Sequence, residues 1–206
     1  MLNKINYKKA FMISFLIILG FVVLLTMRLN DWPWPWYFSR SAGIVAYVFL
    51  FLIMMSGIMI KTKTIYDFIS PSSAWTIHQY IGITLTIAIF AHVFSLIFDG
   101  FLNVSIKELF IPFISDFEPV FIGLGVVALY LFVAVMASSL FYKIKTPKLW
   151  RLLHYLAYPT FIMIFIHGVA IGSDTATPWM QVIYWSTASM ILASTGYRIF
   201  HNWRQA

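Results

Sequence analysis

The amino-acid sequence predicts an all-α integral membrane protein, built as a bundle of six transmembrane helices. Of its 206 residues, 61% are hydrophobic and only 10% are charged, a composition typical of chains that lie in lipid. The apolar residues form runs of roughly 20, the length that a helix needs to cross the hydrocarbon core. Lysine and arginine concentrate on alternate connections between these runs, as in multi-pass membrane proteins. We interpret residues 1–206 as a single domain.

The first two spans are expected on either side of a segment rich in tryptophan and proline. Residues 11–27 follow Lys4, Lys8 and Lys9 and have no small-residue cleavage site after them, so we interpret them as a retained span and not as a signal peptide. Residues 28–40 are expected to form a loop, because their prolines interrupt a helix and their tryptophans anchor at the membrane edge.

Four further spans follow along the chain. The third is preceded by Pro71, which is a helix-start signal. Residues 99–118 form the longest loop, whose apolar centre is expected to lie along the membrane interface, since Pro112 argues against another spanning helix. The six expected spans cover residues 11–27, 41–60, 73–98, 119–142, 149–171 and 178–200.

The charges orient this bundle. Alternate connections and the two termini hold every lysine and arginine except Arg28, Arg40 and Lys107. The positive-inside rule therefore places both termini in the cytoplasm, with the protein in the plasma or inner membrane. The acidic side chains, Asp67 excepted, fall on the outer side. The net charge of +7 thus reflects membrane topology, and we expect no nucleic-acid partner.

Cysteine and histidine usage limits the possible cofactors. The chain has no cysteine, which excludes disulfides, thiolate metal sites, iron–sulfur clusters and covalent c-type haem attachment. Four of the five histidines form two pairs inside apolar spans: His78 and His92, 14 residues apart, and His154 and His167, 13 residues apart. An ionisable residue inside a membrane marks a functional site by default.

The two pairs match in depth. The third and fifth spans run in the same direction, and the histidines are separated by about 21 Å along one and about 20 Å along the other. His78 and His154 therefore share an inner level, while His92 and His167 share an outer level. Each level offers two imidazoles, as a six-coordinate b-type haem requires. Zinc needs three or four ligands at one level, and neither span contains an acidic residue. We predict two b haems stacked between the third and fifth spans.

Helical phase tests this arrangement. The spacing of 14 residues keeps His78 and His92 within about 40° of one face, and Gly82 and Ala88 on that face leave room for a flat macrocycle. The spacing of 13 leaves His154 and His167 about 140° apart on an ideal helix. Our hypothesis is that Pro159 distorts the fifth span and turns His167 towards the bundle interior.

Three charged residues are secondary candidates. Arg151 and Arg40 are expected to pair with a propionate of the inner and the outer haem, respectively, because guanidinium binds carboxylates with two hydrogen bonds. Membrane anchoring and surface solvation are the alternatives for them. Asp174 is expected to cap an outer turn, with an electron acceptor or metal ion docking there as the alternative. We predict no catalytic residue.

The chain resembles the ferric reductase-like transmembrane domain family, which includes ferric reductases and NADPH oxidases. The resemblance rests on the six spans, on His-x13-His in the third and His-x12-His in the fifth, and on three phrases. These are SRSAGIVAY from Ser39, WRLLHYLAY from Trp150 and HGVAIGSDT from His167. The chain is also similar to the haem-binding membrane subunit of the periplasmic methionine sulfoxide reductase system. The family implies two stacked b haems that pass single electrons outwards.

The expected function is a membrane cytochrome b that relays electrons from a cytoplasmic donor to an extracytoplasmic acceptor. No Gly-rich dinucleotide motif occurs, so we expect FAD or FMN only on a separate partner. The donor is then a flavin reductase or a membrane quinone, and the acceptor is ferric ion, dioxygen or a redox protein. The alternatives are a haem subunit of a multi-protein or quinone-linked oxidoreductase, and a haem-free transporter whose histidines form a proton path.

Overall fold

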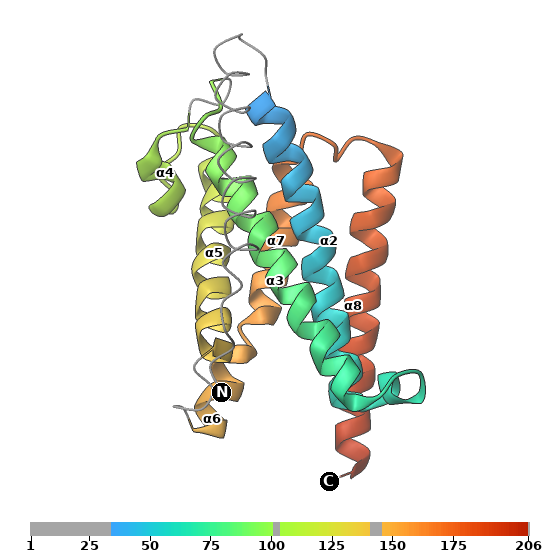
Figure 1. Cartoon of the computed structure of the whole chain (residues 1–206). Coiled ribbons are helices and arrows are strands. Elements are labelled where there is room, and N and C mark those ends of the chain that lie inside the picture. The colour runs from blue at the N-terminus through green and yellow to red at the C-terminus, as the bar shows by residue number, and fades with distance from the viewer. Residues whose placement is uncertain (1–33, 101–103, 141–145, 206) are drawn as a thin grey trace, which may run out of the picture.

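The computed structural model describes residues 34–100, 104–140 and 146–205, and within these residues the chain is helical without strands (Figure 1). The elements are α2 (Trp34–Thr62), the 3-10 helix η1 (Thr64–Asp67), α3 (Pro71–Leu96), α4 (Ile106–Phe110), α5 (Pro119–Leu140), α6 (Pro147–His154), α7 (Ala157–Ile171) and α8 (Pro178–Gln205). The expected all-α fold is confirmed.

Among the described residues, four segments are long and apolar enough to cross a membrane, which fits a membrane protein. They are Trp34–Thr62, Pro71–Leu96, Pro119–Ser139 and Pro147–Ile171. They correspond to the second, third, fourth and fifth expected spans. The expected sixth span is the helix α8, which has 28 residues but is not among the four. The expected first span, residues 11–27, lies outside the described residues.

Prolines mark where the helices begin. Pro71 and Pro147 occupy the first turns of α3 and α6, and the side chains of Ser70 and Thr146 cap these helices by accepting hydrogen bonds from Ser73 and Leu149 N–H. A proline in the first turn costs no hydrogen bond, because the N–H groups there have no partner within the helix.

The same principle corrects one expectation. Residues 28–40 were expected to form a loop, yet α2 begins at Trp34 and carries Pro35 in its first turn. The ring of Pro35 fits there because its fixed φ suits the helix. The N-terminal part of α2 therefore includes Ser39 and Arg40, which become helical residues with fixed directions.

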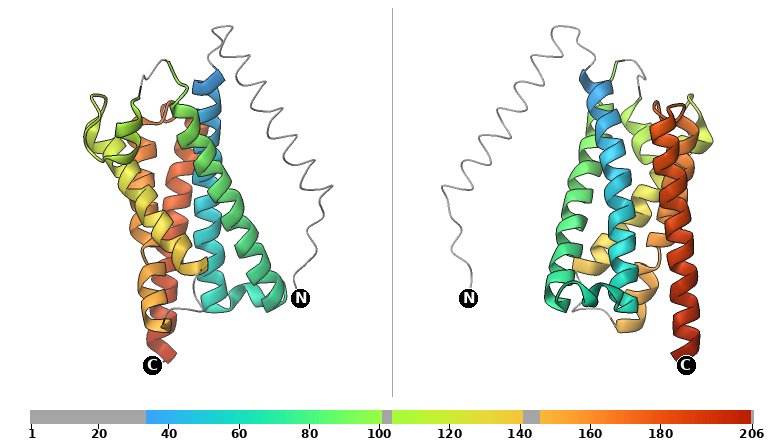
Figure 2. Two further views of the ribbon diagram at one scale, coloured as in Figure 1. Left: turned by 60° about the vertical axis from the view of Figure 1, so that its left-hand side comes forward. Right: turned by 90° about the vertical axis from the view of Figure 1, so that its right-hand side faces the viewer.

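The bundle is organised around α2. It packs along α3 in an antiparallel hairpin closed by η1, and it also contacts α8 (Figures 1 and 2). The helix α5 packs mainly on α7. By contrast, α3 and α7 make few close backbone contacts with each other. The buried core is formed by Tyr47, Leu50, Met54, Ile58, Leu85, Phe132, Phe161, Met180, Tyr184 and Ile191.

The fifth expected span is broken into two helices. α6 ends at His154 and α7 begins at Ala157. At the junction Leu156 N–H donates to Leu153 O and Tyr158 N–H donates to Tyr155 O, both at 3.1 Å and both three residues back. Pro159 has no N–H for the Tyr155 carbonyl four residues earlier. The predicted distortion is therefore present, and it lies just before Pro159.

The outer loop after α3 folds back on α5. Its short helix α4 begins with a capping box formed by Ser105 and Glu108. The hydroxyl of Tyr130 on α5 donates to the Phe110 carbonyl at the end of α4, and Pro112 follows in an irregular turn. The hydrogen bonds from Ser105 hold the pKa of Glu108 below its usual range. The loop does not span the bundle.

Candidate functional site

The inner histidines lie opposite one another on different helices. His78 belongs to α3, and His154 is the last residue of α6. The centroids of their rings are 6.4 Å apart, and the ring planes are inclined by 53°. The structure thus brings together the two side chains that were assigned to the inner level.

A serine on α2 fixes the proton of the His78 ring. The Ser56 hydroxyl donates to the Ile53 carbonyl at 2.9 Å and lies 2.8 Å from His78 Nδ1. Because the single hydroxyl hydrogen points to the carbonyl, Ser56 accepts the hydrogen bond from Nδ1–H. The Nε2 atom of His78 is then the unprotonated nitrogen, which is able to bind a metal.

Backbone carbonyls fix the two outer histidines in the same way. His92 Nδ1 lies 2.9 Å from the Ser39 carbonyl oxygen, and His167 Nδ1 lies 2.8 Å from the Phe121 carbonyl oxygen. A carbonyl only accepts, so both Nδ1 atoms carry the proton and both Nε2 atoms have a free lone pair. Histidines that bind metals typically donate the N–H of the other ring nitrogen to an acceptor of this kind.

His154 is held differently. Its Nδ1 atom is buried and has no hydrogen-bond partner among the described residues. Instead the ring stacks on Trp150, one turn earlier in α6, with centroids 5.1 Å apart and planes inclined by 18°. Arg198 of α8 lies close enough to interact electrostatically with His154.

Glycines on neighbouring helices let three of the rings approach the backbone. A Cβ added at Gly125 would lie 2.8 Å from His167 Nδ1, and one at Gly43 would lie 3.1 Å from His92 Nδ1. A Cβ at Gly57 would lie 3.5 Å from His78 Cε1. The outer rings therefore occupy space that an alanine would take. Gly82, which was expected to line the cofactor, faces Ile53 of α2.

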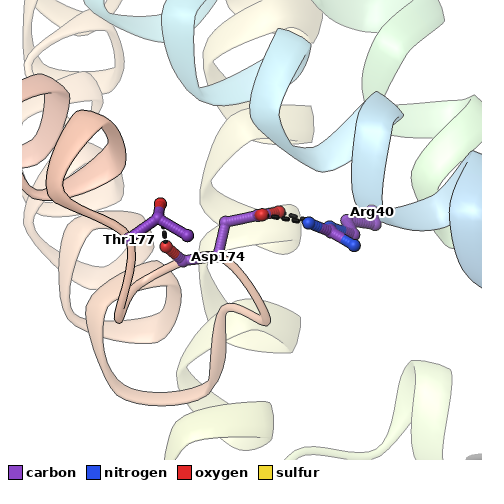
Figure 3. Close-up of polar contacts among 3 residues, drawn as sticks. All are labelled: Arg40, Asp174 and Thr177. Atoms are coloured by element: carbon purple, nitrogen blue, oxygen red, sulfur yellow. Dashed lines mark hydrogen bonds and ion pairs between the residues drawn. The ribbon is translucent and has the colours of Figure 1, made fainter.

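Arg40 and Asp174 form an ion pair at the end of the bundle where α2 begins and the turn from α7 to α8 lies (Figure 3). The Nε and Nη2 groups of Arg40 both donate to the Asp174 carboxylate. Thr177 donates from its hydroxyl, at 2.6 Å, and from its N–H, at 2.8 Å, to the Asp174 carbonyl oxygen. Asp174 thus closes the turn between α7 and α8, as expected, and is only 4% exposed.

This ion pair gives both residues a partner within the chain. The hydrogen bond from the Arg40 guanidinium holds the pKa of Asp174 below its usual range, so the carboxylate is charged at neutral pH. Arg40 follows Ser39, which holds His92, and Asp174 lies seven residues after His167. The pair therefore joins the first turns of α2, which carry Ser39, to the turn that follows the helix of His167. Arg151, the other expected propionate partner, is exposed on α6.

The candidate site offers its imidazoles in pairs. Among the residues that the structure describes, no three histidine, aspartate or glutamate side chains come together to hold a metal ion. Two facing imidazoles with free Nε2 atoms are the donor set of a six-coordinate haem iron. Three or four ligands at one level would be the set for zinc.

The sequence singled out the four histidines but not the groups that hydrogen-bond to three of them. Ser39 and Ser56 were not singled out as partners, because a serine in a helix usually bonds its own backbone. One signal was present: Gly43 and Gly57 are 14 residues apart, the same spacing as His92 and His78 on the antiparallel helix beside them. Arg198 was counted only among the positive charges that orient the bundle.

The comparisons with known proteins give a family without a known function. Residues 35–174 match the family described as a domain of unknown function, DUF8596, and the chain belongs to this family. The match includes all four paired histidines. No curated protein and no solved structure matches this chain.

Proposed function

We propose that this protein is a membrane cytochrome b that relays single electrons from a cytoplasmic donor to an extracytoplasmic acceptor. His78 and His154 hold the inner b haem, and His92 and His167 hold the outer one. The observation that carries the proposal is the geometry of the inner pair, supported by the fixed tautomers of three of the four histidines.

The separation of the inner rings fits a shared iron. With metal–nitrogen bonds of roughly 2.0 Å, and each ring centre roughly 1.1 Å beyond its nitrogen, two imidazoles on opposite faces of one iron have centroids about 6.2 Å apart. The inner centroids are 6.4 Å apart. Histidines that hydrogen-bonded to each other would instead need their nitrogens near 3 Å and one donor directed at the other ring.

The chain's own residues supply the ligands and their orientation. A b haem bound by two imidazoles gains and loses one electron at its iron without binding a substrate there. The Ser39 and Phe121 carbonyls and the Ser56 hydroxyl orient three of the ligands, and Trp150 packs on the fourth.

The proposal includes a topology of six spans with both termini in the cytoplasm. Residues 11–27 are the first span and α8 is the sixth. Electrons then move from the inner to the outer level, and an inside-negative membrane favours this movement by about 2.3 kcal/mol per charge per 100 mV. Electrons enter from a flavin reductase or a membrane quinone and leave to ferric ion, dioxygen or an extracytoplasmic redox protein.

A pyridine haemochrome assay on the full-length protein in detergent tests this function, with reduced-minus-oxidised spectra of four His→Ala variants. We expect two b haems per chain in the wild type. His78→Ala and His154→Ala should lose the same haem, and His92→Ala and His167→Ala the other. His201→Ala is the matched control and should keep both. A folded wild-type protein that takes up no haem when haem is abundant contradicts the proposal and favours a transporter with a histidine proton path.

A further inference from the structure

The two histidine levels differ in what receives the imidazole Nδ1 proton. At the outer level both protons are donated to backbone carbonyls, those of Ser39 and Phe121, at 2.9 and 2.8 Å. At the inner level His78 donates to the Ser56 hydroxyl, whereas His154 has no acceptor among the described residues. An amide carbonyl is a stronger hydrogen-bond acceptor than an alcohol oxygen, and a ring without an acceptor is affected least of all.

The levels also differ in local charge. Arg198 is fixed beside the inner level, because its Nη1 donates to Tyr158 Oη at 2.7 Å and its Nη2 to Tyr155 Oη at 3.2 Å. Tyr155 lies one residue after His154, and Tyr158 lies four residues after it. The Arg198 guanidinium also lies over the Tyr155 ring, 5.4 Å from the ring centroid, within the reach of a cation–π contact. At the outer level the charge of Arg40 is balanced by Asp174.

From these contacts we propose that Ser56 and Arg198 set the reduction potential of the inner level, and that this level has the more positive potential of the two. Both residues act through other groups: Ser56 through the His78 ring, and Arg198 through its electrostatic field. The proposal rests on the proposed function, since it concerns the same two haem levels.

Each residue acts by a stated mechanism. An acceptor at Nδ1 makes the imidazole more basic, and a more basic ligand stabilises ferric over ferrous iron. The carbonyls therefore lower the outer potential more than a single hydroxyl lowers the inner one. A fixed positive charge favours the reduced form, which carries one positive charge fewer. Both effects raise the reduction potential of the inner level relative to that of the outer level.

This order has a consequence for the direction of transfer. An inner level of more positive potential collects electrons readily from a cytoplasmic donor. Passage to the outer level is then slightly unfavourable at zero membrane potential. An inside-negative membrane compensates, because it favours outward electron movement. Electron flow through the protein should therefore increase with membrane potential.

Spectroelectrochemical titration of the full-length protein tests the proposal, with reduced-minus-oxidised spectra recorded at each potential. Ser56→Ala removes an acceptor and should shift one of the two components to more positive potential, changing its oxidised-to-reduced ratio about fivefold at fixed potential. Arg198→Gln should shift the same component to more negative potential. The control is Ser138→Ala, since the Ser138 hydroxyl donates to the Val135 carbonyl of its own helix, and it should shift neither component.

Conservative variants separate tuning from loss of structure. Ser56→Thr keeps the hydroxyl and Arg198→Lys keeps the charge, so each should restore most of the wild-type potential. The proposal is established if Ser56→Ala and Arg198→Gln shift the potential of the more positive component in opposite directions and leave the other component unchanged. Shifts of the more negative component, equal shifts of both, or no shift in either variant overturn it while leaving two bound haems, and therefore the proposed function, intact. A wild-type protein without haem overturns both.

Discussion

At the scale of single residues, the outer histidines depend on glycines that face them. Gly125 is the tightest case, because a Cβ there would lie 2.8 Å from His167 Nδ1, closer than real Cβ contacts allow. The ring would have to leave its hydrogen bond with the Phe121 carbonyl. Overpacking of this kind typically costs about 1–3 kcal/mol.

We predict that Gly125→Ala loses the outer haem and keeps the inner one, as measured by haem content and difference spectra. Gly57→Ala should keep both, since its Cβ would lie 3.5 Å from the His78 ring, an ordinary contact. Gly196→Ala, with nothing within 4 Å of the added atom, controls for helix propensity. Full retention of both haems in Gly125→Ala contradicts this account of the outer level.

The ion pair between Arg40 and Asp174 predicts a pH-dependent contribution to stability. The pKa of Asp174 is lowered from its ordinary value of 3.8 by the hydrogen bond from Arg40. The contribution is therefore complete above that value and is lost as the pH falls through the lower folded-state pKa. Arg40 is partly exposed, so the contribution should be about 1 kcal/mol.

Asp174→Asn should lower the Tm at pH 7, as measured by thermal unfolding in detergent. The difference from wild type should shrink as the pH falls below 3.8 and be smallest below the lower folded-state pKa, where the folded wild-type carboxylate is protonated. Ser173→Ala, which changes the neighbouring exposed residue, should leave the Tm unchanged. A difference that persists undiminished in acid would assign the effect to packing of the turn and not to the charge.

The histidines could be predicted at this scale, but their partners could not. Ionisable side chains are rare inside spans, so four paired histidines stand out from the sequence. The acceptors at Ser39 and Phe121 are backbone carbonyls, which every residue has. The partner of Arg40 was expected to be a propionate, whereas the structure pairs it with Asp174, 134 residues away. Only the fold brings such residues together.

At the scale of secondary-structure elements, prolines account for both the successes and the errors of sequence reasoning. Helices were expected to start near Pro71, Pro119 and Pro178, and they do. Pro35 was interpreted as a helix breaker, but it sits in the first turn of α2, where proline is favoured. Pattern alone did not distinguish a proline inside a helix from one at its start.

The break before Pro159 yields a prediction. Pro159→Ala would restore an N–H for the Tyr155 carbonyl and favour one continuous helix through residues 147–171. His154 and His167 would then lie about 140° apart. Because α7 is held by α5 and by the His167 hydrogen bond, the short helix α6 should rotate and carry His154 away from His78.

Haem content and difference spectra of Pro159→Ala measure this rotation. We expect loss of the inner haem with the outer one retained. Pro147→Ala changes a proline that starts α6 and interrupts no hydrogen bond, so it is the matched control and should retain both. If Pro159→Ala also retains both, tertiary contacts and not the proline maintain the break.

At the scale of the whole molecule, the proposed ligands come from two separate packing units. α3 is held by α2, and α7 is held by α5, so His78 and His92 belong to one unit and His154 and His167 to the other. Spans can be recognised from hydropathy, but their pairing cannot, because the apolar faces of different spans are chemically alike in lipid. Small residues such as Gly43 and Gly125 decide which helices approach closely.

The orientation of the molecule can be tested because the chain has no cysteine, which gives a blank background for single-cysteine labelling. Asp67, in η1, and Ser173, in the turn between α7 and α8, are both exposed and lie at opposite ends of the bundle (Figure 1). With both termini in the cytoplasm, Ser173→Cys should react with a membrane-impermeant maleimide in intact cells. Asp67→Cys should react only after permeabilisation. The reverse pattern would place the His78 and His154 level outside, and electrons from the cytoplasm would then reach the His92 and His167 level first.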